Sequence, residues 1–390
     1  MPSRHALLGP SSAHRWMLCT PSAKWEATLP DTESEAAQEG TLAHSICEVK
    51  LKAARGKAQG KRGPLKGITK LRADPLYTES MDKYTDQYVE LVMRDYEAYL
   101  LAGYNPELFI EVQLDLSKWA PDSFGTSDAV IVTDDRIHVY DFKYGKGVPV
   151  SADHNPQMMM YALGAYEKFS MLEEFKLAMM TIIQPRIDNF SEWSCTVPEL
   201  LQWGEQSLIP AAQKAFVGEG QFVPGEKQCR FCRGRYRCRF NAAYQLQFLK
   251  EWKSDRNGPE LSPLEIGGIL EQVAAIKSWA EGMKETAQKR AMDGERIPGW
   301  KLVKGRAVRK ITNPYDAIQK LLETGADPKT IYELKGITEL EKSFTSDGLK
   351  SVLGDLIQLT TPKPALARES DSREEYNPIN PNDYFKEEND

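Results

Sequence analysis

Two aspartates and a lysine lie at positions where two predicted strands bring them together. Asp141 and Lys143 end the strand-like run RIHVYDFK two residues apart, so their side chains share one face of that strand. The preceding run, GTSDAVIVT, carries Asp128 and is joined to the next by the short polar segment TDDR. A symmetric hairpin places Asp128 directly opposite Asp141, with Cβ atoms roughly 5 Å apart.

Facing carboxylates of this kind suggest a metal site. Like charges directly opposite each other destabilise a sheet, so the pair needs a compensating positive charge. A divalent cation supplies that charge, because Mg²⁺ favours carboxylate oxygens plus water. Lys143 would then lie close enough to orient or activate a metal-bound water. A hydrogen-bonded structural Asp/Lys cluster is the alternative, and it is the commoner meaning of a lone D-x-K tripeptide.

The elements around these strands predict an α/β fold with a mixed central sheet flanked by helices. Helical patterns cover about 33–54, interrupted by Gly40, and 81–102, ending at Gly103. A helix from Pro156 separates the third and fourth strands. The strand signals, in chain order, are ELFIEVQLDL, GTSDAVIVT, RIHVYDFK, FKLAMMTIIQP and FSEWSCTV.

Length and composition divide the 390 residues into three parts. We expect a core domain over 1–250, a mostly helical accessory region over 255–365 and a disordered acidic tail over 366–390. Residues 369–390 hold eight acids against two basic residues, a net −6 that equals the charge of the whole chain. The remainder is therefore near neutral, which is compatible with a locally basic surface that binds a polyanion. No apolar run approaches the roughly 18 residues of a membrane span, and the N-terminal stretch lacks an apolar signal core.

Four short motifs in order resemble the PD-(D/E)XK nuclease superfamily, specifically its RecB-type branch. GTLAHSICE resembles the helical histidine motif, GTSDAVIV the G-x-x-D motif, VYDFKYG the D-x-K motif and QMMMYALGAY the Q-x-x-x-Y motif. The resemblance covers about residues 11–240 and implies a restriction-endonuclease-like core. The residues that it assigns to the catalytic site are His44, Asp128, Asp141, Lys143, Gln157 and Tyr161.

The resemblance also implies a role for each of these residues. His44, Asp128 and Asp141 would ligate Mg²⁺ or Mn²⁺, and Lys143 would serve the hydrolytic water. Gln157 and Tyr161 are i, i+4 neighbours on one helix face and would border the DNA channel; for Tyr161, simple packing is the alternative. Glu111 is a candidate extra ligand, because the family pattern often has an acid in that strand.

The cysteines form a second constellation. Cys229, Cys232 and Cys238 lie just after the core, and Cys19 lies just before it. This split arrangement resembles the iron–sulfur staple of RecB-type nucleases, as in the CRISPR-associated adaptation nucleases and the AddB subunit of recombination complexes. It implies a 4Fe–4S cluster held by the four thiolates, and zinc is the alternative metal that these thiolates could bind. The two remaining cysteines, Cys47 and Cys195, are expected to be buried small apolar residues.

The segment between these cysteines is basic and contains interleaved aromatic residues. We predict DNA contacts from Arg230, Arg233, Arg235 and Arg237, with base stacking on Phe231 and Tyr236. The resemblance extends to RecB-like proteins of phages and prophages. It implies an exonuclease that acts in recombination or replication within the cytoplasm of a bacterial host. A single-strand annealing or binding protein is the implied partner. A non-catalytic nucleic-acid-binding subunit that holds an iron–sulfur cluster or zinc is the second hypothesis.

Overall fold

A computed structural model of the chain describes residues 6–30, 34–61, 65, 67–171, 174–251, 261–302, 314–323, 348 and 351. The chain divides into two compact units, Met1–Leu302 and Val303–Asp390. The first unit extends past the end of the predicted core domain at residue 250. The predicted accessory region, 255–365, is therefore shared between the two units.

A five-stranded mixed sheet forms the centre of the first unit. Its strands follow the chain order β1-β2-β3-β4-β5, and β3 and β4 are the parallel pair, whereas the other neighbours are antiparallel. Helix α6 makes the crossover between the parallel strands, as a parallel connection requires. The strands are β1 (Glu107–Asp115), β2 (Phe124–Val132), β3 (Arg136–Phe142), β4 (Leu177–Gln184) and β5 (Asn189–Thr196).

The register of the β2–β3 hairpin confirms the predicted alignment. Ala129 pairs with Tyr140 and Val132 with Ile137, and the Thr133 N–H donates to Arg136 O across the short connection. The ladder ends at the Ala129–Tyr140 pair, and Asp128 and Asp141 are the residues directly next to that pair. The symmetric hairpin inferred from the sequence is therefore the one the chain forms.

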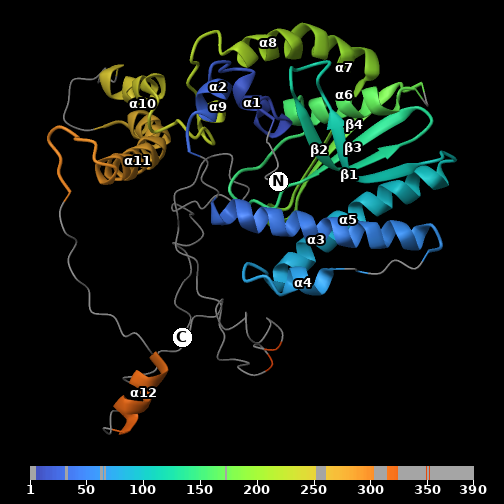
Figure 1. Cartoon of the computed structure of the whole chain (residues 1–390), viewed down its shortest axis with the longest axis horizontal. Coiled ribbons are helices and arrows are strands. Elements are labelled where there is room, and N and C mark those ends of the chain that lie inside the picture. Colours follow the sequence, from blue (N-terminus) through green and yellow to red (C-terminus); the bar gives the residue numbers. More distant parts are fainter. Residues whose placement is uncertain are drawn as a thin grey trace, which may run out of the picture. The chain divides into compact units, whose positions relative to one another are not determined.

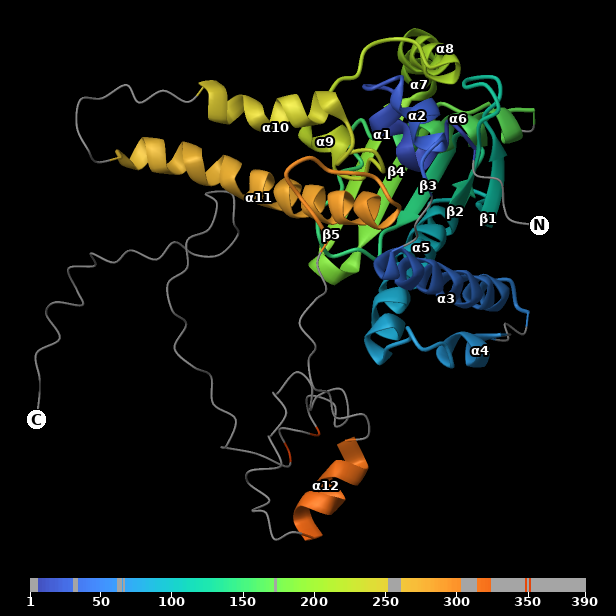
Figure 2. The same ribbon diagram turned by 60° about the vertical axis from the view of Figure 1, so that its left-hand side comes forward.

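Helices cover both faces of this sheet (Figures 1 and 2). Helices α3 and α5 pack on one face around Ile46 and Tyr88, and α6 packs on the other with α7 and α8 beyond it. The longer helices of the unit are α3 (Glu35–Ala58), α5 (Glu79–Leu101), α6 (Pro156–Phe169), α10 (Arg239–Glu251) and α11 (Pro263–Met292). The shorter ones are α1 (Ala13–Trp16), α2 (Ser22–Ala27), α4 (Ile68–Arg72), α7 (Val197–Trp203), α8 (Ile209–Val217) and α9 (Glu226–Cys229). Single 3-10 turns lie before α1 at Pro10–Ser12 and between β4 and β5 at Pro185–Ile187, and a π-helical turn at Gly204–Leu208 joins α7 to α8.

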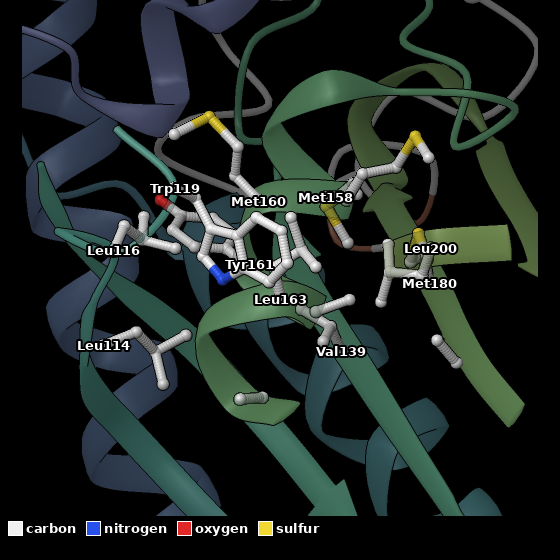
Figure 3. Close-up of a cluster of buried hydrophobic side chains, with 14 of the residues drawn as sticks. Leu114, Leu116, Trp119, Val139, Met158, Met160, Tyr161, Leu163, Met180 and Leu200 are labelled. Carbon is white, nitrogen blue, oxygen red and sulfur yellow. The ribbon is translucent and has the colours of Figure 1, made fainter. Parts of the chain in front are cut away.

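Helix α6 is buried on nearly every side because it fills the space between the sheet and α7. Its apolar residues leave few polar positions, and Asn155 caps its start by accepting hydrogen bonds from Gln157 N and Met158 N. Figure 3 shows Met158 of this helix on the side of Leu200 and the sheet residue Met180, and Met160 beside Trp119. The packing holds Gln157 at the end of the helix that faces the carboxylates.

Two helical predictions need comment. Helix α3 runs through Gly40 without a break, so the predicted interruption is wrong; a glycine costs about 1 kcal/mol in a helix, which the buried face of a helix this long offsets. In the second unit α12 (Pro314–Glu323) agrees with the expectation of a mostly helical accessory region. The predicted acidic tail lies outside the described residues. No described helix has the length and apolar composition to cross a membrane.

Candidate active site and cysteine pocket

His44 and Asp128 meet at one edge of the sheet, from α3 and β2. His44 Nδ1 lies 3.1 Å from Asp128 Oδ1, and the other oxygen of this carboxylate accepts the backbone N–H of Phe142 at 2.7 Å. The imidazole also packs edge-on against the Phe142 ring, with centroids 5.4 Å apart. Both the ring and the carboxylate are therefore fixed by groups of the fold.

Asp141, Lys143 and Gln157 form a closed polar triangle beside this pair. The Lys143 ammonium donates to Asp141 Oδ1 and to Gln157 Oε1, each at 3.1 Å, and Gln157 Nε2 donates to Asp141 Oδ1 at 2.9 Å. Gln157 thus contacts both other members from the first turn of α6. The two predicted motifs D-x-K and Q-x-x-x-Y are joined by direct hydrogen bonds.

Glu111 joins the site from β1 through an unusual backbone conformation. Its φ is 51°, in the left-handed region that non-glycine residues rarely adopt. Ligand atoms of His44, Glu111 and Asp128 all lie within 4.8 Å of one another. Strain of this kind persists only where the surroundings enforce it, and it clusters at functional sites.

The charges of the site are not balanced. Burial, together with the charge of Asp128, raises the pKa of Glu111 to about 7, and burial likewise raises the pKa of Asp141. Burial alone would lower the pKa of His44 and raise that of Asp128, but their mutual attraction reverses both, and the His44 pKa rises to about 9. Three carboxylates thus face two cationic side chains, His44 and Lys143.

The residues present fit a divalent cation. Asp141 Oδ2 is buried and lies 2.9 Å from the Lys143 ammonium, so this oxygen is already paired with a cation. The fit to a divalent cation therefore rests on the donor set that His44, Glu111 and Asp128 bring together. Carboxylate oxygens with one imidazole are donors that Mg²⁺ and Mn²⁺ accept.

Tyr161 is placed inside the fold rather than on its surface. Its side chain is 7% exposed, and a Cβ on Gly125 would come within 2.9 Å of the Tyr161 ring. Burial raises the pKa of this phenol well above its usual value, and its hydroxyl bonds with Gln157. The contact favours packing and support of Gln157 over the predicted DNA contact, and it explains why the G-x-x-D segment needs glycine.

The four predicted cluster cysteines line one pocket at the far side of α1. Cys19 follows α1, and Cys229, Cys232 and Cys238 come from the segment around α9. All four are free thiols, so no disulfide joins them. Cys47 and Cys195, predicted to be buried apolar residues, are indeed buried.

Backbone N–H groups point at the sulfur atoms of this pocket. Val223 N donates to Cys19 Sγ and Gly225 N to Cys229 Sγ, both at 3.4 Å, and Asn241 N donates to Cys238 Sγ at 3.5 Å. Such hydrogen bonds stabilise negative charge on sulfur. Burial nevertheless raises the pKa of Cys19, Cys229 and Cys232, the last to about 12. The thiols are therefore neutral unless a metal replaces their protons.

An ion pair that the sequence did not signal closes the pocket. Arg15 Nε lies 2.5 Å from Glu26 Oε2, and Arg15 also donates to Phe231 O at 3.3 Å. Glu26 accepts the backbone N–H of Arg233 at 2.7 Å. Arg15 is four residues before Cys19, a spacing that could have marked it, but nothing in the sequence marks Glu26.

The basic segment is only partly available for DNA. Arg230 pairs with Glu226 at 2.7 Å, and Arg235 donates to Arg230 O and lies over the Tyr236 ring at 4.3 Å. Tyr236 packs against Gly282 of α11 so closely that a Cβ there would clash. Tyr236 is thus a packing residue in this unit, whereas Phe231 is 67% exposed, and Arg233 and Arg237 are also exposed.

Comparisons with known proteins identify a family without assigning an activity. A solved structure titled "Crystal structure of SSO0001" is 15% identical and covers 57% of this chain and 95% of its own, with a TM-score of 0.23. The family described as "Protein of unknown function (DUF2800)" matches residues 5–374. Because that match spans nearly the whole sequence, this chain belongs to the DUF2800 family.

Proposed function

We propose that this protein is a metal-dependent DNA nuclease of the PD-(D/E)XK superfamily, of the RecB type. The observation that carries the proposal is the meeting of side chains from five elements at one place. Helix α3 supplies His44, strands β1 and β2 supply Glu111 and Asp128, β3 leads through Asp141 to Lys143, and α6 supplies Gln157. A purely structural ion pair needs neither the strained Glu111 nor a third carboxylate.

His44, Glu111, Asp128 and Asp141 would hold Mg²⁺ or Mn²⁺. When bound, such an ion supplies a Lewis acid for the phosphodiester and lowers the pKa of a coordinated water. The chain's own residues do the positioning. Asp128 is held by Phe142 N, and Asp141 by Lys143 and Gln157, so neither carboxylate has to be ordered when a cation arrives.

Lys143 is the residue best placed to serve the attacking water. An ammonium has three hydrogens to donate, and two are used by Asp141 and Gln157. The third is left for a water or a phosphate oxygen in front of the carboxylates. Gln157 fixes the direction of that hydrogen by holding the ammonium from the side of α6.

We take the proposed occupant of the cysteine pocket to be a 4Fe–4S cluster rather than zinc. Tetrahedral zinc with Zn–S bonds of about 2.3 Å places its sulfurs about 3.8 Å apart. Among the described cysteines no three sulfur atoms lie within 4.8 Å of one another. A larger group with N–H···S hydrogen bonds is the simpler occupant, held by Cys19, Cys229, Cys232 and Cys238. Its role would be to join the start of the unit to its later segment.

The remaining parts of the proposal concern substrate and partners. Phe231, Arg233 and Arg237 are exposed residues of the basic segment and would contact the DNA. An exonuclease acting with a single-strand annealing or binding protein in phage or prophage recombination would use such a surface. The cytoplasm of a bacterial host is the corresponding place of action.

Labelled DNA incubated with Mn²⁺ and, separately, with EDTA tests the activity. Cleavage in Mn²⁺ that EDTA abolishes supports the nuclease, and end-blocked and circular substrates then separate exonuclease from endonuclease action. If the metal-loaded protein binds DNA but leaves it intact under all of these conditions, the non-catalytic binding subunit replaces the nuclease.

A further inference from the structure

An exposed histidine stacks on a tryptophan next to the proposed catalytic residues. The His154 ring lies 4.4 Å from the Trp193 ring, centroid to centroid, with the planes tilted by 39°. The His154 side chain is 73% exposed, so its outer face is open to solvent. Trp193 on β5 is half-buried and packs on the core beneath α6. Together they form a two-ring stack with one free face.

The backbone at His154 is held in an unfavourable conformation. Its φ is 49°, in the left-handed region that non-glycine residues adopt only at a cost. Hydrogen bonds from Ala152 N to Ser191 Oγ and from Asn189 Nδ2 to Val150 O tie the loop to β5. The loop therefore keeps the ring in place, at a position where glycine would avoid the cost.

The stack lies beside the triangle of Asp141, Lys143 and Gln157. His154 precedes Gln157 by three residues, at the start of α6. In the sheet, Asp141 aligns with Ile182 and Ile182 with Ser191, so Ser191 is two strands away, and Trp193 follows it on the same face. With strands about 4.8 Å apart, Trp193 is roughly 12 Å from Asp141. A nucleic-acid strand that runs from the site over β5 would pass the stack within a few nucleotides of the reacting phosphate.

We propose that the free face of His154, backed by Trp193, stacks on an unpaired base of the nucleic-acid strand next to the bond that is cut. The proposal rests on the nuclease function and adds a substrate class to it, a single-stranded end or region. Aromatic and histidine rings are the side chains that bind unpaired bases by stacking. Asp153 Oδ1 accepts a hydrogen bond from His154 Nδ1 at 2.6 Å, which helps to fix the orientation of the ring.

The test is binding of a short single-stranded oligonucleotide that carries 2-aminopurine, measured by fluorescence in EDTA so that no cleavage occurs. His154→Ala should weaken binding about 5- to 100-fold, the range for losing one stacked base. His154→Trp should bind at least as tightly as the wild type, and His154→Lys should resemble His154→Ala. The control is Phe190→Ala, which removes a ring 45% exposed on the opposite face of β5 and should bind like the wild type.

A double-mutant cycle locates the base. An abasic site at the contacted position should weaken wild-type binding by the same factor as His154→Ala and should cause no further loss in that variant. Equal binding by His154→Ala and Phe190→Ala overturns the stacking proposal, and so does an equal loss on fully paired duplex. If the wild type still cleaves DNA in Mn²⁺, either of these results leaves the nuclease proposal intact. If the wild type neither cleaves DNA nor binds the oligonucleotide, both proposals fail.

Discussion

The carboxylate site and the cysteine pocket are both assembled from distant segments, but they balance their polar groups differently. In the carboxylate site, His44 compensates Asp128 and Lys143 compensates Asp141. In the pocket, burial raises the pKa of the Cys19 and Cys232 thiols, and no disulfide joins the described cysteines. Contacts such as those of Arg15 with Glu26 and Phe231 join the two segments of the pocket without a metal. We therefore expect the proposed metal group to add more to stability in the pocket than in the carboxylate site, whose charges already pair with one another.

The largest effect should come from removing a cysteine of the pocket. Cys19→Ala removes a ligand of the proposed cluster, whose link would close a loop of about 210 residues and, by analogy with a disulfide, would be worth up to about 5 kcal/mol. We expect poorly soluble, colourless full-length protein with a much lower melting temperature. Iron analysis and a visible spectrum of anaerobically purified protein check the loading, with about four irons expected per chain.

The matched control for that variant is Cys195→Ala, which trims a buried thiol outside the pocket. It should cost about 1 kcal/mol and leave the iron content unchanged. One zinc, no iron and no colour in the wild type would refute the cluster while leaving the nuclease proposal intact.

The next effect is on cleavage rather than on stability. Asp141→Ala should lower Mn²⁺-dependent cleavage by about 1000-fold or more, since a metal ligand and the partner of Lys143 are both lost. The melting temperature should change little, because Lys143 is partly exposed and water can replace the carboxylate. The control variant is Asp115→Ala, which removes an exposed acid at the end of β1. Equal cleavage rates for Asp141→Ala and Asp115→Ala would disprove the assignment of Asp141.

A smaller effect is expected where the carboxylate site is packed against its neighbours. Gly125→Ala places a Cβ 2.9 Å from both Tyr161 Cε1 and Pro10 Cγ. Overpacking of this kind costs about 1–3 kcal/mol, and displacement of Tyr161 should also slow cleavage. Gly145→Ala is the control, because nothing lies within 4 Å of a Cβ there. Denaturant unfolding of both variants decides whether the close contact is real.

A pH titration measures the stability that is lost in acid through His138, a residue outside both the carboxylate site and the cysteine pocket. Burial, with Arg136 nearby, lowers the pKa of His138 to about 3 in the folded chain from 6.5. Above pH 6.5 both states are neutral at this residue. Between pH 6.5 and about 3 only the unfolded state takes up the proton, so stability falls by about 1.4 kcal/mol per pH unit as the pH is lowered.

His138→Gln should flatten that dependence, since no proton uptake at this position remains. Urea unfolding at pH 7 and pH 5 measures it. If wild type and variant lose the same stability between these values, the acid sensitivity resides elsewhere, and the carboxylate site becomes the first place to look.

The sheet and most of the first site were predictable because they follow from local patterns. Alternating apolar residues define the strands, the short connection fixes the Asp128–Asp141 register, and the apolar face of α5 defines that helix. Features that depend on two distant residues were not predictable. Tyr236 against Gly282 extends the first unit beyond residue 250, and Arg15 with Glu26 closes the pocket, yet no local pattern announces either contact. The left-handed Glu111 was equally invisible, because its sequence reads as ordinary strand.

The position of Cys19 also affects the order in which parts of the unit can be completed during synthesis of the chain. Its pocket partners extend to Cys238, so the last of them emerges from the ribosome about 220 residues after Cys19. At about 5–20 residues per second, that delay is roughly 10–45 s. The five strands are complete by Thr196, so the sheet can form first. The N-terminal helices would be joined to the cysteine segment only later. Delivery of the proposed cluster before Cys238 has emerged would meet an incomplete set of ligands, and the supply of that cluster, rather than folding of the sheet, would then set when the newly made unit is finished.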